Sequence, residues 1–269
     1  MSNTTKRYYI AVDLEGMACT IGTPGQGLAQ GSAGLEYASL QGTREANAAA
    51  KALFDCGADE VWIWDCHGTG YNLKYDMLDK RCKIVMGAGS GKRFPCIEEG
   101  FAGVLFIGYH AYDTSDAVLC HVYSSATFQH QKINGSFVGE AHIDGAVAGK
   151  YGVPVIFASS DDICISQMGE AFPWAETVVT KRSLAWNSCI SDHPEKVCDN
   201  IYAGVKKAVS RIGEMQTFTY PENFEYEIRY KRIEPAQGCH YRNPDGTLFS
   251  RPDAYTRVGV MRDVEDIFK

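Results

Sequence analysis

Short apolar runs alternate along most of the chain with longer segments of mixed polarity, a pattern typical of proteins built from alternating strands and helices. Residues 8–13 form the first run, which leads into acidic residues and a glycine, as buried parallel strands often do. Residues 43–57 favour a helix with Thr43 as its N-cap. Residues 61–65 then resume as a strand. We therefore predict a βαβ unit with a right-handed crossover over residues 8–65.

The stretch from Gly16 to Gly42 is too rich in glycine for a regular element and longer than most connections between elements. Loops of that length are commonly functional lids or disordered segments. We therefore expect neither a helix nor a strand between the first strand and Thr43.

The same alternation continues toward the C-terminus. Asn134-Gly135 indicates a hairpin turn, because both residue types tolerate positive φ angles. We expect strands at residues 104–107, 153–157 and 224–230, a further apolar run at 118–123, and helices at 141–150 and 195–212.

These elements predict an α/β fold: a three-layer α/β/α arrangement around a mainly parallel sheet, plus a smaller C-terminal α+β part. We expect residues 1–269 to form a single unit, because single cores stop growing near about 250–300 residues. If the chain subdivides, residues 1–165 would form the α/β core and residues 166–269 a C-terminal part of helices and strands.

Composition excludes several classes of protein. The chain has 26 Lys and Arg against 33 Asp and Glu and lacks a basic tract, so we expect no nucleic-acid partner. An apolar content of 45% excludes a disordered chain. The N-terminal apolar run is too short for a signal peptide or a membrane helix, which predicts a cytoplasmic protein with no membrane partner. The ten cysteines, none in a Cys-x-x-Cys pair, are expected to be reduced and mostly buried.

Acids and histidines follow several of the predicted strands. Asp13 and Glu15 are two residues apart, a spacing that directs both carboxylates to the same side of an extended chain. Asp65 and His67 repeat this spacing after the second strand, and His110 follows a third. Ligands of open α/β sheets bind beyond the carboxyl ends of the strands, so these side chains should meet at one edge.

The candidate ligands are Asp13, Glu15, His67 and His110, and Glu140, at the start of a predicted helix, is a fifth. Three carboxylates and two imidazoles suit a divalent ion, zinc first, with manganese or cobalt as alternatives; a bridging carboxylate would let five side chains hold two ions. Each residue alone has a structural explanation, since an acid can cap a turn, a histidine can be a hydrogen-bonded core residue, and Glu140 suits the first turn of a helix. Recurrence at the strand ends is what favours a metal site.

Six blocks in register carry a more specific signal. They are Ala-Val-Asp13-Leu-Glu15-Gly16; Asp65-Cys-His67-Gly68 with Asn72-Leu73; Gly108-Tyr-His110-Ala111 with His121; Asn134-Gly135-x-x-x-Gly139-Glu140; Gly152-Val-Pro-Val; and Ser160-Asp161-Asp162. In this order, over roughly residues 8–230, the chain resembles the D-aminopeptidase DppA family, peptidase family M55.

The resemblance implies a dinuclear zinc aminopeptidase that releases an N-terminal D-amino acid from short peptides of the D-Ala-D-Ala kind. By motif, Asp13 would bridge two Zn²⁺ ions per subunit. Glu15 and His67 would complete one ion, and His110 and Glu140 the other. His121 falls where the family keeps its catalytic histidine. Family members assemble as ring-based decamers that enclose the active sites, so the resemblance also implies a homo-oligomer.

The chain departs from the family pattern at three places. Cys66 stands where serine is usual and Leu14 where methionine is common, but residues between ligands on a strand face the other way. Residues 239–257 look like an insertion that does not align with the family. If this segment covers the site or an oligomer contact, substrate preference could differ from D-Ala-D-Ala.

A glycine-rich string at residues 87–93 suggests a phosphate-binding loop. It has Met86 where the P-loop pattern needs glycine and Arg93 where it needs Ser or Thr, so a turn is the better interpretation. The remaining histidines have no partner at ligand spacing and are expected to be surface or core residues: His130, His142, His193 and His240.

Three other functions stay open at this stage. An amidase or an L-aminopeptidase would use the same metal ligands with a different pocket. A two-metal phosphoesterase would need a basic side chain to hold phosphate, and Arg44 is the only one near the first motif. A non-catalytic peptide-binding protein would have no need of His121 beside five metal ligands.

Overall fold

The structure, a computed structural model, describes residues 5–269 and contains two β-sheets. The larger sheet has seven strands in the order β3-β2-β1-β4-β7-β8-β9, and all neighbours are parallel except β8 and β9. Its strands are β1 (Arg7–Val12), β2 (Glu60–Asp65), β3 (Lys83–Val85), β4 (Gly103–Ile107), β7 (Val155–Asp161), β8 (Glu176–Ala185) and β9 (Ser188–Ser191).

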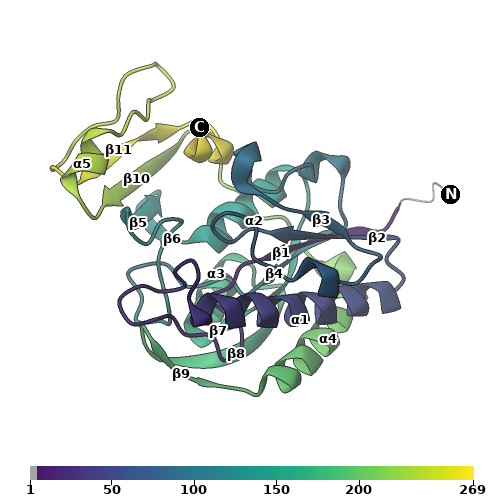
Figure 1. The fold of residues 1–269 in the computed structure, drawn as a ribbon. Coiled ribbons are helices and arrows are strands. Elements are labelled where there is room, and N and C mark those ends of the chain that lie inside the picture. Colours follow the sequence, from purple (N-terminus) through teal and green to yellow (C-terminus); the bar gives the residue numbers. More distant parts are fainter. Residues whose placement is uncertain (1–4) are drawn as a thin grey trace.

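Helices cover both faces of this sheet (Figure 1). The strands are apolar on both sides, and alternate residues enter two different cores. Tyr8 and Ile10 pack with α1 (Ala33–Asp55) and α4 (Pro194–Ser210), whereas Tyr9 and Ala11 pack with α2 (Glu140–Lys150) and α3 (Asp162–Ala171). The predicted three-layer α/β/α architecture with a mainly parallel sheet is confirmed.

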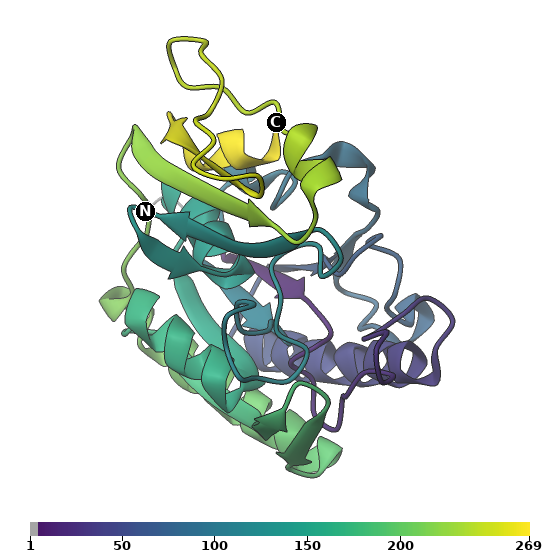
Figure 2. The same cartoon turned by 90° about the vertical axis from the view of Figure 1, so that its left-hand side faces the viewer.

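The smaller sheet is antiparallel and has the order β11-β10-β5-β6 (Figure 2). Its strands are β5 (Phe128–Ile133), β6 (Ser136–Val138), β10 (Phe224–Tyr230) and β11 (Thr256–Met261), followed by the 3₁₀ helix η5 (Val264–Phe268), with α5 (Ile233–Gln237) after β10. Apolar residues of β5 and β10 join the same core as α2. The sheet therefore lies against the α2 side of the large sheet and combines the middle of the chain with its C-terminal part.

The hairpin prediction is confirmed, and short 3₁₀ helices complete the connections. Asn134 and Gly135 join β5 to β6 with φ angles of 50° and 80°. The 3₁₀ helices are η1 (Tyr75–Met77), η2 (Ala88–Ser90), η3 (Ile97–Glu99) and η4 (Ile212–Glu214). No helix in residues 5–269 combines the length and the apolar character that crossing a membrane requires.

Helix α1 corrects the prediction for the glycine-rich stretch. The helix begins at Ala33 rather than after Thr43, and its N-cap Ser32 accepts a hydrogen bond of 3.1 Å from the backbone of Leu35. Thr43 lies inside the helix, where its hydroxyl donates to the carbonyl of Ser39. Only the segment before Ser32 is the irregular loop that the composition predicted.

The reason is a tertiary contact that composition does not reveal. A Cβ atom at Gly42 would lie 2.8 Å from a methyl carbon of Leu14, so this helical glycine lets α1 approach the loop after β1 closely. Its helix-breaking tendency is overridden by packing.

Further expectations differ from the structure. Strand β7 continues beyond the predicted end at residue 157 to Asp161, whose side chain caps α3. The apolar run 118–123 is irregular chain, and strands β8 and β9 had no clear sequence signal. Only Cys120 and Cys164 of the ten cysteines are buried, so the expectation of mostly buried thiols is wrong. Cys19 and Cys96 are exposed, and the other six are partly exposed.

Candidate metal centre

The five side chains predicted to bind metal converge at the carboxyl edge of the large sheet. Nδ1 of His67 lies 3.0 Å from Oδ1 of Asp13 and 3.2 Å from Oε2 of Glu15. Nε2 of His110 lies 3.0 Å from Oε1 of Glu140 and 3.5 Å from Oδ2 of Asp13. Asp13 thus stands between the two halves of the cluster, in contact with an imidazole on each side.

Four different elements deliver these residues. Asp13 and Glu15 follow β1, His67 follows β2, His110 follows β4, and Glu140 is the first residue of α2. Strands β1, β2 and β4 are adjacent and parallel, so their carboxyl ends open at the same edge. The edge of the sheet explains the convergence.

Asp65 shares the Asp-x-His spacing but has a different task. Its carboxylate accepts hydrogen bonds from the backbone amides of Asn72 and Leu73 and from the hydroxyl of Tyr75. The side chain of Asn72 also donates to the carbonyl of His67, at 2.7 Å. Asp65 therefore fixes the loop that carries His67 and does not enter the cluster.

The turn after Glu15 depends on a glycine. The amide of Gly16 donates to the carbonyl of Gly108 at 2.7 Å, and a Cβ atom at residue 16 would lie 2.1 Å from the carbonyl oxygen of Tyr109. Only glycine allows the chain after β1 to pass so close to the chain after β4. This close approach brings the carboxylates of Asp13 and Glu15 next to His110.

Lys181, from β8, binds the backbone of the same turn. Sequence analysis did not identify this residue. Its buried ammonium donates to the carbonyls of Glu15, Met17 and Thr20, the last two at 3.0 and 2.7 Å. Burial lowers the pKa of this lysine. Its three backbone acceptors fix the path of the chain that presents Glu15.

Two imidazoles are oriented by backbone carbonyls. Nδ1 of His110 donates to the carbonyl of Ala111 at 3.1 Å, and Nδ1 of His121 donates to the carbonyl of Leu119 at 2.8 Å. In both rings the other nitrogen, Nε2, is thereby left facing the cluster, an arrangement common in metal sites. The two rings stack with centroids 3.9 Å apart, and Nε2 of His121 lies 4.0 Å from Oε1 of Glu140.

The protonation equilibria of the cluster are strongly coupled to one another. Burial raises the pKa of Asp13 to about 7, and the neighbouring Glu15 carboxylate adds to the rise. Burial alone would lower the pKa of His110, but Glu140 and Asp13 raise it to about 10. Burial would raise the pKa of Glu140, but His110 lowers it to about 2. The negative charges thus draw protons onto His67 and His110, whereas burial and the neighbouring His110 lower the pKa of His121.

The donor set fits a divalent cation. Oδ2 of Asp13 and Oε2 of Glu15 are buried and make no hydrogen bond within the described residues. Two overlapping groups have ligand atoms within 4.8 Å of one another: Asp13, Glu15 and His110, and His110, His121 and Glu140. Carboxylate and imidazole donors are typical of zinc, and an ion would supply the positive charge that protons otherwise supply.

Arg93 lies beside the cluster, and the sequence did not indicate this. Its guanidinium forms two hydrogen bonds to Asp144, of 2.8 and 2.5 Å, and Nη2 lies 3.9 Å from Oε2 of Glu140. The expectation that Arg44 is the only basic residue near the first motif is therefore wrong for the folded chain. The string at residues 87–93 is irregular, as predicted, with η2 inside it, but its last residue is a partly buried partner of α2.

Cys66 and the remaining histidines lie outside the cluster's contacts. The thiol of Cys66 is 3.8 Å from the hydroxyl of Tyr109, and burial raises its pKa well above the usual value, which disfavours a nucleophilic thiolate. His130 pairs with Glu227, His142 accepts from the backbone of Gly139, His193 is the N-cap of α4, and His240 is exposed.

A cavity of about 790 Å³ opens over the cluster. Its floor includes the six residues Asp13, Glu15, His67, His110, His121 and Glu140. Its walls come from the irregular loop at 25–29, the segment 119–126 and Trp186. Part of the glycine-rich loop thus borders the site, and the cavity is large enough for a short peptide.

Comparison with known proteins gives consistent results. The family model of D-aminopeptidases, Peptidase_M55, matches residues 7–250. The D-aminopeptidase of Bacillus subtilis (strain 168) is 30% identical over 237 residues, which span 86% of this chain and 84% of the relative. A solved structure, described as the Zn-dependent D-aminopeptidase DppA from Bacillus subtilis, a self-compartmentalizing protease, superposes with a TM-score of 0.87. It is 24% identical, over 97% of this chain and 94% of that one.

Proposed function

The chain belongs to peptidase family M55, the D-aminopeptidases, and on that premise we propose that it is a dinuclear zinc aminopeptidase. It would hydrolyse the N-terminal residue of short peptides that contain D-amino acids, such as D-Ala-D-Ala. The observation that carries the proposal is the buried cluster itself. Three carboxylates and three imidazoles face one cavity, and two carboxylate oxygens have no hydrogen-bond donor.

The assignment of ligands follows the two halves of the cluster. Asp13 would bridge two ions, because each of its oxygens faces a different imidazole. Glu15 and His67 would complete one ion, and His110 and Glu140 the other. Manganese or cobalt would suit the same donors.

Bound zinc would supply Lewis acidity and an activated water nucleophile. The chain's own residues would support hydrolysis in two ways. His121 is held by Leu119 and by stacking on His110, with Nε2 free at the cavity. There it would carry a proton between the nucleophile and the leaving amine, or stabilise the oxyanion of the tetrahedral intermediate. The cavity walls would orient the peptide across the cluster.

Two alternatives keep the same cluster. An amidase or an L-aminopeptidase would differ only in the residues that line the cavity. A phosphoesterase is disfavoured, because the guanidinium of Arg93, which lines the cavity, is already paired bidentately with Asp144 and the ammonium of Lys181 is taken up by backbone carbonyls. A non-catalytic peptide-binding protein would have no need for a free Nε2 beside the carboxylates.

Membership of the family also guides our proposals for the oligomeric state, the cellular location and the domain organisation. The related solved structure is described as self-compartmentalizing, and we propose a homo-oligomer, a decamer, that encloses the sites in the cytoplasm. Residues 1–269 would act as one metallopeptidase unit. Strands β8 and β9 of the large sheet, and helix α4 that packs on it, lie beyond residue 165, whereas strands β5 and β6 of the small sheet lie before it.

One combined measurement tests the function. Metal content of the purified protein would be determined together with kcat/KM on D-Ala-D-Ala, L-Ala-L-Ala and D-alaninamide, before and after chelation. We expect about two zinc ions per subunit and activity on the D-peptide that chelation abolishes and zinc restores. Equal activity on the L-peptide or on the amide would favour the alternatives. Binding of the dipeptide with no turnover would favour a peptide-binding protein.

Replacing His121 by alanine tests its role. We expect unchanged zinc content and a loss of kcat of about 100-fold or more, in the range found for general acid–base groups. Hydrolysis that survives within about tenfold would show that His121 is not the acid or base.

A further inference from the structure

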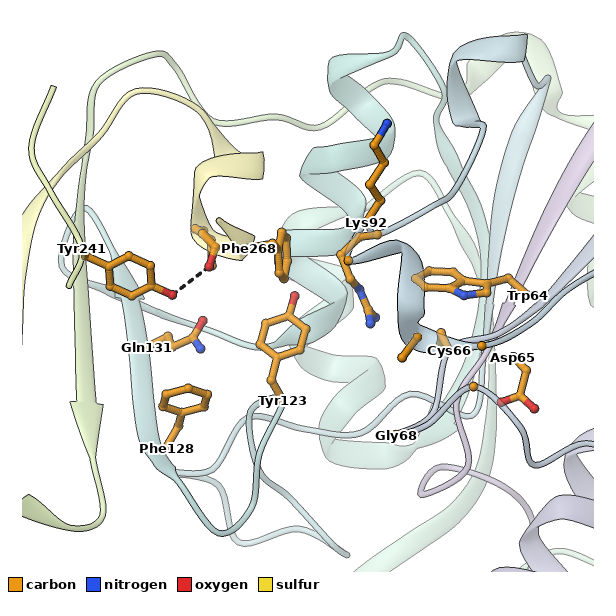
Figure 3. Close-up of a pocket in the computed structure, with 16 residues that line it drawn as sticks. Trp64, Asp65, Cys66, Gly68, Lys92, Tyr123, Phe128, Gln131, Tyr241 and Phe268 are labelled. Carbon is orange, nitrogen blue, oxygen red and sulfur yellow. Dashed lines mark hydrogen bonds between the residues drawn. The ribbon is translucent and has the colours of Figure 1, made fainter. Parts of the chain in front are cut away.

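A second, smaller cavity of about 300 Å³ lies beside the metal cluster (Figure 3). It shares four lining residues with the larger cavity: Cys66, Gly68, Arg93 and Tyr123. A ligand seated over the carboxylates can therefore extend a group into this side pocket. The volume is at the lower limit of ligand pockets and suits one side chain rather than a cofactor.

Five aromatic side chains line the pocket, and they include residues of both sheets. Trp64 belongs to β2 and Phe128 to β5, and Tyr123 lies between them with its ring 5.4 Å from that of Phe268. Tyr241 closes the far side, where its hydroxyl donates to the carbonyl of Ile267 at 2.8 Å. Tyr241 lies in the segment 239–257, so the segment that sequence analysis could not assign helps to build this pocket.

One polar group in the wall lacks a partner. Gln131 is only 2% exposed, and its Oε1 makes no hydrogen bond within the described residues. Figure 3 shows its amide between Tyr241, Tyr123 and Phe128, on the side of the pocket opposite Trp64 and Cys66. Buried amide oxygens are almost always paired, so this one is placed to receive a donor from a ligand.

The charged groups of the pocket are already paired or directed away. Arg93 is neutralised by Asp144, and the carboxylate of Asp65 is taken up by Asn72, Leu73 and Tyr75. Lys92 is exposed, and its side chain points away from the rings (Figure 3). The pocket therefore favours an uncharged group.

We propose that this side pocket is a specificity subsite for a phenol side chain of the peptide substrate, whose hydroxyl donates to Gln131. The ring would lie among the aromatic side chains of the wall. A site built to bond a hydroxyl discriminates against the analogue that lacks it. The inference rests on the proposed peptidase function, because it assumes that a peptide lies over the carboxylates.

The test compares matched peptides on the zinc-loaded protein. The panel places tyrosine, phenylalanine or alanine in D-form before or after D-Ala, and kcat/KM is measured for each. We expect a tyrosine peptide to exceed its phenylalanine counterpart by about tenfold, the scale of one neutral hydrogen bond, and the alanine peptide by more. Gln131→Leu should abolish the tyrosine-over-phenylalanine ratio, because it removes the amide oxygen that accepts the hydroxyl.

The matched control is Gln129→Leu. Gln129 is in the same strand but exposed, and it bonds to Arg229 instead of lining the pocket. It should leave the tyrosine-over-phenylalanine ratio unchanged. A second variant, Ala88→Phe, places a ring at an exposed position of the pocket rim and should depress hydrolysis of the tyrosine peptide while sparing the alanine peptide.

A binding measurement separates this inference from the proposed function. Calorimetry would give the Kd of free D-tyrosine and D-phenylalanine, which cannot be hydrolysed, for the wild-type protein and for Gln131→Leu. A tyrosine preference that Gln131→Leu removes supports the subsite even if no peptide is cleaved, an outcome that would overturn only the peptidase. Cleavage of alanine peptides with no tyrosine preference, or a preference that Gln131→Leu leaves intact, would overturn the subsite and leave the peptidase standing.

Discussion

Glu140 and Asp144 lie one turn apart on α2 and belong to two buried clusters with opposite charge balance. Asp144 is fully buried and accepts two hydrogen bonds from Arg93 and one of 2.7 Å from Tyr109, so its charge is matched by a guanidinium. Glu140 shares its cluster with Asp13 and Glu15, and the charged groups that contact all three carboxylates are imidazoles, with Arg93 only at 3.9 Å from Glu140.

The difference separates a structural cluster from the proposed metal site on the same helix. A complete ion pair holds α2 against the segment that ends at Arg93. The three carboxylates of the other cluster have no full counter-charge, so their mutual repulsion is unfavourable until a cation binds. Sites of this kind are expected to reduce the stability of the metal-free protein and to gain stability on binding.

The largest effect should come from breaking the complete pair. Arg93→Met leaves Asp144 buried without a counter-charge, so we expect the free energy of unfolding of the metal-free protein to fall by about 3–5 kcal/mol. Urea denaturation followed by circular dichroism measures this. The double variant Arg93→Met, Asp144→Leu removes both charges and should recover most of the loss. A single variant as stable as wild type would remove the distinction between the clusters.

The next effect concerns activity. Asp13→Asn removes the carboxylate between the two halves of the cluster, and we expect kcat/KM to fall by more than about 100-fold, or about 2.7 kcal/mol, with reduced zinc content. Metal-free stability should stay equal or rise, because one excess negative charge is lost. Elemental analysis, peptide hydrolysis and urea denaturation report the three quantities. Full zinc content and full activity in Asp13→Asn would contradict the ligand assignment.

A smaller effect is expected at the turn beneath the metal cluster. Lys181→Met leaves three buried carbonyls without their donor, and we expect a loss of about 1–3 kcal/mol in unfolding free energy. Because the turn carries Glu15, zinc affinity should also fall by about 10–100-fold. Lys196→Met, which removes an exposed lysine, serves as the control and should change neither quantity.

The smallest effect on stability is expected at a more accessible ion pair, that of Glu227 with His130 and Lys132. His130 and Lys132 lower the pKa of Glu227 against the effect of burial, which raises it. Glu227→Gln should cost at most about 1 kcal/mol. A lowered carboxylate pKa stabilises the fold above the usual value of about 4.3, so the difference should be present at pH 7 and shrink as the pH falls through the lowered pKa. A loss as large as that of Arg93→Met would contradict the contrast between accessible and buried pairs.

The sheet and the cluster were predictable for the same reason. Adjacent parallel strands have their carboxyl ends at the same edge of the sheet. Residues that directly follow such strands, as Asp13 and His110 do, can therefore be predicted to lie close together. Glu140 was predictable because it begins a helix. The local sequence pattern is sufficient to predict a site residue where the strand or helix that carries it also determines where its side chain lies.

The supporting residues were not predictable, because their partners are distant in sequence. Arg93 stands at the end of a glycine-rich turn, and Asp144 is on a helix that its own pattern does not connect to that turn. Lys181 lies on a strand without a clear apolar signal. Gln131 reads as an ordinary polar strand residue, and only the folding of Tyr241 over it makes its amide a buried, unpaired group. The start of α1 was not predicted because Gly42, which has a low helix propensity, lies inside the helix where close packing against Leu14 leaves no room for a side chain.

The four-stranded sheet has a consequence for synthesis of the protein on the ribosome. All six residues of the metal cluster have been translated by the time Glu140 emerges, whereas β10, β11 and the rings of Tyr241 and Phe268 arrive last. The nascent chain thus carries every side chain of the cluster while Lys181, which fixes the turn of Glu15, and the wall of the side pocket are still to come. The side pocket is the last part of this region to be completed by synthesis.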